Sequence, residues 1–136
     1  MLLFYSLCAT SKTIELSNVS SELFINEHLS ILQDSSANLS YQNALTQYKQ
    51  GLFTENRDKK VSFGFTHDVL WASVLINNAS AEEVKRVFYL DTAWLDHADF
   101  YFIHQNKLTD KASIGDALPY HARKKTNPHV IATTHI

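Results

Sequence analysis

The chain has very little of several residue types that mark particular classes of protein. Its 136 residues include one cysteine, three glycines and two prolines. A single cysteine, Cys8, excludes an internal disulfide and a zinc site of the CxxC type. With so few glycines and prolines the sequence contains no low-complexity linker, and it contains no internal repeat. The composition therefore predicts one domain with one core.

Charge is also scarce, and neither sign dominates. Charged residues make up 19% of the chain, and the formal net charge is −2. A domain that binds nucleic acid usually needs a basic face. The one basic run, Arg123-Lys124-Lys125, is typical of a solvated loop. The charge balance therefore predicts no nucleic-acid partner. No segment approaches the ~20 apolar residues of a membrane span, so we expect a globular domain.

The first thirteen residues allow two interpretations. A short apolar run from Leu2 to Ala9 precedes polar residues 10–13, as at the end of a secretory signal. Small residues at Ala9 and Ser11 could flank a cleavage site. The alternative is a first β-strand. We predict a signal-peptide remnant at 1–13 and an exported domain at 14–136.

One segment has the spacing of a helix. Its apolar positions are Tyr41, Ala44, Leu45, Tyr48 and Leu52. These positions lie on one helical face. Ser40 is suited to cap the N-terminus and Gly51 to end the helix.

The remaining periodic segments predict short strands. They lie at 14–16, 28–32, 61–65, 70–77, 84–90, 97–104 and 130–134. Within 97–104 the apolar side chains face one way, and Asp99 and Tyr101 face the other. Gln105-Asn106-Lys107 predicts a hairpin turn. The regular spacing favours an antiparallel jelly-roll β-sandwich with one short helix. Because the chain ends within a strand pattern, we expect its last strand or strands to be missing.

Four sequence elements follow one another in an order typical of one family. They are HLSILQDSSANLSYQNAL, FGFTHDVLWASVLINNAS, YLDTAWLDHADFYFI and GDALPYHAR. The family patterns are D-x-S/T-x-x-L-S, G-x-T/S-x-x-x-x-W, W/L-L-D-x-V-x-L-Y and G-D-x-x-P-F-x-x-R. In these elements the chain resembles the second type of extracellular domain of bacterial seven-transmembrane receptors with diverse intracellular signalling modules. The resemblance covers about residues 14–136.

The resemblance implies a fold, a location and a function. It implies a periplasmic sensor domain of an inner-membrane receptor, with a jelly-roll fold like that of carbohydrate-binding modules. A membrane domain and a kinase or cyclase output would lie further along the full protein. The chain departs from the family at Ser73, where an arginine is often found, and at Ala98, which is smaller than the usual residue.

Five residues are candidates for contact with a ligand: Trp71, Ser73, Asp99, Tyr101 and Arg123. Aromatic rings on an open sheet face stack on sugar rings, and polar neighbours bind hydroxyl groups. Trp71 could equally be a core residue. Arg123 could instead pair with Asp116 to close a loop that begins at Gly115.

No pattern in the sequence indicates catalysis. The chain has no nucleophile elbow, P-loop or HExxH motif. His97 and Asp99 share a strand face, but two ligands do not define a metal site. We therefore expect no enzyme, no cofactor and no metal.

Three functions remain open. The first is a periplasmic domain that binds a carbohydrate-like or other small polar ligand, including one bearing a carboxylate, and shifts a receptor between two states. The second is a secreted carbohydrate-binding or adhesion module, and the third is a dimerisation module that forms a homodimer.

Overall fold

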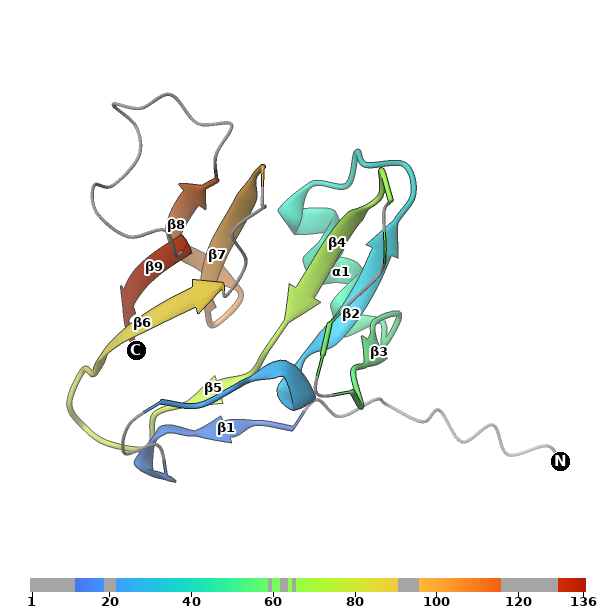
Figure 1. Cartoon of the computed structure of the whole chain (residues 1–136). Helices are drawn as coiled ribbons and strands as arrows, with labels where there is room; N and C mark the ends of the chain where they lie inside the picture. Colours follow the sequence, from blue (N-terminus) through green and yellow to red (C-terminus); the bar gives the residue numbers. More distant parts are fainter. Residues whose placement is uncertain are drawn as a thin grey trace, which may run out of the picture. The chain divides into compact units, whose positions relative to one another are not determined.

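The computed structural model describes residues 12–18, 22–58, 60–61, 64, 66–90, 96–115 and 130–136, and for 130–135 it describes the backbone alone. The chain forms two compact units, Met1–Ala79 and Ser80–Ile136 (Figure 1). The proposed leader at 1–13 falls almost wholly outside the described residues, as do Asp116 and the basic run 123–125.

The first unit contains a three-stranded antiparallel sheet in the order β3-β2-β4. Its strands are β2 (Ser30–Asp34), β3 (Thr54–Glu55) and β4 (Val69–Ser73). β2 begins later than the predicted segment 28–32, because His28 belongs to a 3-10 turn, Asn26–His28. A second 3-10 turn spans Leu16–Asn18.

The predicted single strand at 70–77 is wrong, because the structure divides it between two sheets. β4 ends at Ser73, and β5 (Ile76–Asn77) pairs in parallel with β1 (Ile14–Glu15). The Ile14 amide donates to the Leu75 carbonyl at 2.8 Å, and the Asn77 side-chain amide donates to Glu15 at 2.8 Å. The chain leaves β2 after Ser73 and pairs with β1 from Ile76, so residues 74–75 belong to neither strand. This pair is also an exception to the antiparallel pairing that we predicted.

The helix α1 (Tyr41–Lys49) forms as predicted, with both ends capped locally. The Ser40 hydroxyl accepts a hydrogen bond from the Asn43 amide at 3.3 Å. At the other end Gly51 has φ +74°, and its amide donates to the Tyr48 carbonyl. The Leu52 amide reaches back to the Gln47 carbonyl at 3.0 Å, which completes a Schellman motif.

The turn between β2 and α1 is organised by the buried carboxylate of Asp34. One oxygen accepts from the Ser36 amide at 3.0 Å and the Ser36 hydroxyl at 2.6 Å, and the other accepts from the Leu39 amide at 3.0 Å. These hydrogen bonds hold the pKa of Asp34 below its ordinary value, and the bond from the Ser36 hydroxyl has the largest effect. The D-x-S-x-x-L-S element is therefore a turn followed by a helix cap.

The buried apolar side chains of the first unit come from elements far apart in the sequence. They are Ile14, Leu16, Ile31, Ala44 and Phe53. The Phe53 ring packs edge-on against Tyr48 of α1, with centroids 5.4 Å apart. Burial of these side chains joins the strands and the helix of this unit through the hydrophobic effect.

The second unit contains two antiparallel strand pairs. β6 (Lys85–Leu90) pairs with β9 (Val130–His135), and β7 (Ala98–His104) pairs with β8 (Lys107–Ile114). The predictions at 84–90, 97–104 and 130–134 are confirmed to within a residue, whereas β8 and the short β3 were not predicted. Of the predicted strand 61–65, Val61 and Gly64 lie outside any strand, and the other three residues are not described.

The mostly-β prediction with one short helix is confirmed, and the jelly-roll sandwich stays a prediction. In the described part of the chain, no helix has the length and apolar character required to cross a membrane.

Candidate ligand-binding site

The site is built on the hairpin of β7 and β8. The two strands are joined by Gln105 and Asn106, which have φ +48° and +65°. Positive φ at both central residues defines a type I′ turn, whose twist matches that of the flanking strands. The predicted hairpin turn at 105–107 is therefore confirmed, and it fixes which residues of β8 can face β7.

A β-bulge at Thr109 then shifts the pairing by one residue. Ile103 pairs with Leu108, but Phe102 pairs with Asp110, so Thr109 is the extra residue. Its hydroxyl donates to the Phe102 carbonyl at 3.0 Å. Beyond the bulge, Tyr101 lies opposite Lys111.

The alternation of apolar side chains explains this register. With the bulge, Phe100 pairs with Ala112 and Ala98 with Ile114, so apolar partners share one face. The Phe102 ring on this face lies 5.6 Å from that of Phe88 and 6.4 Å from that of Phe100. Without the bulge, the one-residue shift would turn Ala112 and Ile114 to the opposite face.

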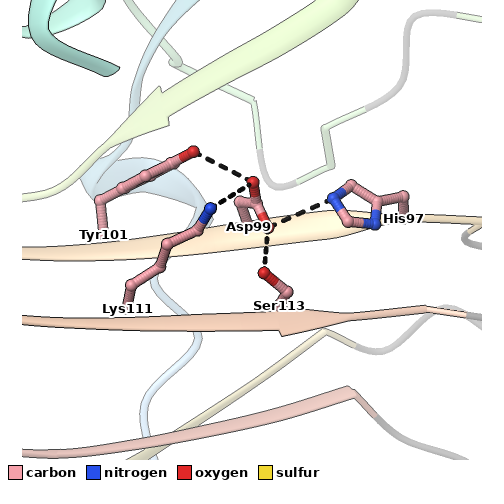
Figure 2. Close-up of polar contacts among 5 residues, drawn as sticks. All are labelled: His97, Asp99, Tyr101, Lys111 and Ser113. Atoms are coloured by element: carbon pink, nitrogen blue, oxygen red, sulfur yellow. Dashed lines mark hydrogen bonds and ion pairs between the residues drawn. The ribbon is translucent and has the colours of Figure 1, made fainter. Parts of the chain in front are cut away.

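The opposite face of the hairpin carries a polar cluster centred on Asp99 (Figure 2). We define the Asp99 cluster as His97, Asp99, Tyr101, Lys111 and Ser113. Oδ1 of Asp99 accepts from the Ser113 hydroxyl at 2.5 Å and lies 3.2 Å from Nε2 of His97. Oδ2 accepts from the Tyr101 hydroxyl at 3.0 Å and lies 3.2 Å from Nζ of Lys111. All four contacts converge on one carboxylate.

The charges of the cluster stabilise one another. Partial burial alone would raise the pKa of Asp99, but the hydrogen bonds from Ser113, Lys111 and Tyr101 outweigh it and lower that pKa. The bond to Asp99 raises the pKa of Lys111. Partial burial, with the bond to Asp99, raises the pKa of Tyr101. Asp99 is therefore ionised and Lys111 protonated near neutral pH.

Aromatic surface adjoins these charges. Nζ of Lys111 lies 5.0 Å from the centre of the Tyr101 ring, within the range of a cation–π contact. The Lys111 side chain is 44% exposed and that of Asp99 is 24% exposed. A molecule in solution could therefore reach the ammonium group directly.

The described residues of the predicted site belong to both units. Asp99 and Tyr101 share one face of β7, as predicted. Trp71 and Ser73 lie in the first unit on β4, half-buried, opposite Leu32 and Ser30 of β2. Their contact with a ligand stays a prediction, and Arg123 lies outside the described residues.

Lys111 and Ser113 were missed by the sequence reasoning. The turn at 105–106 was a usable signal, because counting outward from it reaches the partners of β7. Without knowledge of the bulge, however, the count places Asp110 opposite Tyr101. The bulge is what selects Lys111.

His97 contributes to the cluster through Asp99. The predicted proximity of the two side chains is confirmed by their 3.2 Å contact. Within the described ranges, no group of three or more His, Cys, Asp or Glu side chains gathers as a metal site would require.

Comparison with known families agrees with the order of the four sequence elements. The sequence model of the 7TMR-DISM extracellular 2 domain matches residues 26–135. The chain belongs to this family. No curated protein matches the chain. As a 7TMR-DISM extracellular domain, it is part of a membrane protein and in bacteria lies in the periplasm. Domains of this family are extracellular sensors of seven-transmembrane receptors and are generally non-catalytic.

Proposed function

We propose that this domain senses a small polar molecule that binds on the polar face of the β7–β8 hairpin. The Asp99 cluster is the observation that carries the proposal, because four side chains, from β7, β8 and the residue before β7, converge on one carboxylate. Family membership supports a sensing role in the periplasm. The proposal includes the jelly-roll arrangement and the likeness to carbohydrate-binding modules that the sequence elements imply.

The protonation of the cluster favours binding over catalysis. A general acid or base works best when its pKa is near the working pH. Here the pKa of Asp99 is lowered, and those of Tyr101 and Lys111 are raised. All three shifts move the pKa of the group further from pH 7. They suit fixed charges and hydrogen-bond donors that hold a ligand.

Binding would act by shifting the population of receptor states. A ligand can favour one state only by the difference between its affinities for the two states. A shift from 1:99 to 99:1 requires a difference of about 5.5 kcal/mol. The membrane-spanning and output parts of the receptor would lie outside these 136 residues.

The proposal can be tested by titrating the 136-residue chain with a library of mono- and disaccharides and small organic acids. Binding would be followed by calorimetry and by amide chemical shifts. We expect at least one compound to bind, and Tyr101→Ala to weaken its binding by about tenfold. Tyr89→Ala is the matched control, because Tyr89 is an exposed tyrosine on β6, outside the Asp99 cluster.

Equal losses in the two variants would refute the assignment of the site to the hairpin. Trp71→Ala tests the predicted contribution of β4 in the same assay. Broad binding of polysaccharides on a glycan array would instead favour an adhesion module.

A further inference from the structure

We infer that the ligand is an organic carboxylate with a hydrocarbon part. Its carboxylate would bind Lys111, and its hydrocarbon part would lie on Tyr101, Ile103 and Leu108. This inference rests on the proposed function, because it names the class of ligand for the same hairpin face.

The first argument is that most acceptor positions of Asp99 are already occupied. An ionised carboxylate offers about four acceptor positions. His97 and Ser113 contact one oxygen, and Tyr101 and Lys111 contact the other. Three of them, Ser113, Tyr101 and Lys111, donate hydrogen bonds to Asp99, so the hydroxyl groups of a sugar would have to compete with these partners for it. The carboxylate therefore serves to hold its neighbours in place.

The second argument is the donor capacity that remains at Lys111. An ammonium group carries three N–H donors. Its contacts with described residues are the bond to Asp99 and, at Tyr101, a side-chain hydrogen bond and the face of the ring. Lys111 is also the more exposed member of the ion pair, with 44% of its side chain exposed against 24% for Asp99. A second carboxylate would make a charge-assisted hydrogen bond with the remaining donor.

The third argument is an exposed apolar pair next to the cluster. Ile103 follows Tyr101 on the same strand face and is paired with Leu108 across the hairpin. These two side chains are 38% and 39% exposed. They lie roughly 7 Å along the strand from the pair of Tyr101 and Lys111. A hydrocarbon part would bury this surface, whereas sugar hydroxyl groups there would lose water without gaining partners.

The test compares hexanoate with its neutral isostere hexanamide and with glucose, using the amide spectrum of the 136-residue chain. We expect hexanoate to shift the amides of Tyr101, Ile103, Leu108 and Lys111, and hexanamide to bind at least about tenfold more weakly. Leu108→Ser should weaken hexanoate binding as well, because it removes apolar contact.

Variants of Lys111 give the second comparison. Lys111→Gln should weaken hexanoate binding by about tenfold, and Lys111→Arg should retain it. The control is Lys107→Gln, which removes an exposed lysine from the same strand, outside the cluster. Unchanged amide shifts elsewhere in the Lys111→Gln spectrum would confirm that the variant is folded.

Each outcome decides between the two proposals. Equal affinity for hexanoate and hexanamide in the native chain would overturn the inference, whether or not Lys111→Gln folds. If sugars shift these amides and acids do not, the proposed function stands and the carboxylate class is wrong. If neither class of compound shifts them, both proposals fail.

Discussion

Substitution of Gly115 by alanine should cost more stability than the same substitution at Gly51 or Gly64. Gly115 follows β8 directly and has φ +136°. A Cβ atom built there would lie 2.2 Å from the Asp96 carbonyl oxygen and 2.7 Å from the Cα of His97. Both are backbone atoms, so no side-chain rotation can relieve the contact. The segments would have to separate by roughly 0.8 Å to reach a separation of 3.0 Å.

The expected cost combines two effects. A non-glycine residue at such a φ costs about 1–3 kcal/mol, and forcing an extra carbon into packed structure costs about 1–3 kcal/mol. We therefore expect Gly115→Ala to cost about 4 kcal/mol. That is a large part of the ~5–15 kcal/mol by which a domain is stable.

Gly51→Ala is the matched control, because it separates the two effects. Gly51 also has positive φ, +74°, but a Cβ atom there would meet nothing within 4 Å. Only the conformational cost of about 1–2 kcal/mol should remain. Urea denaturation followed by circular dichroism measures both changes, and hydrogen exchange locates them. We expect loss of protection in β7 and β8 for Gly115→Ala. Equal costs for the two variants would refute the steric argument.

Three further predictions concern local interactions. Ser40→Ala should cost about 1 kcal/mol by removing the cap of α1, whereas Ser40→Asp should be nearly neutral in the same urea titration. Because the pKa of Asp34 is lowered from 3.8 on folding, its contribution is present above that value and is lost as pH falls through the folded pKa. The stability difference between the native chain and Asp34→Asn should thus shrink between pH 6 and pH 3, and a constant difference would contradict this account. Deletion of Thr109 should remove the bulge at a cost of about 1 kcal/mol, while an NMR contact between Tyr101 and Lys111 persists.

The sequence predicted elements whose causes are local. The helix α1 needs only a capping hydroxyl, an apolar stripe and a glycine that accepts positive φ, and all three lie within 13 residues, 40–52. The face of β7 that carries Asp99 and Tyr101 likewise follows from alternation along one strand.

The elements that were missed depend on pairing between distant segments. β4 pairs with β2 and β5 pairs with β1, so the break between them depends on segments distant in the sequence, and nothing local to 70–77 marks it. Lys111 joined the site only through the bulge at Thr109, which adds a single residue to the count from the turn. A one-residue change of register turns every side chain beyond it to the opposite face. Overlooking one bulge is therefore enough to miss the residues of β8 that belong to the site.

Several residues that define the family pattern perform structural tasks in this chain. Asp34 and Ser40 of the first element hold a turn and a helix cap. Asp96 of the third element and Gly115 of the fourth lie against each other, at a separation that excludes any side chain at the glycine. Lys111, by contrast, belongs to none of the four elements. The pattern thus includes Tyr101 of the β7–β8 face but leaves the cation of the cluster unspecified. We accordingly expect the ligand to follow from this chain's own cluster, and members without a cation at the position of Lys111 to bind ligands of another class.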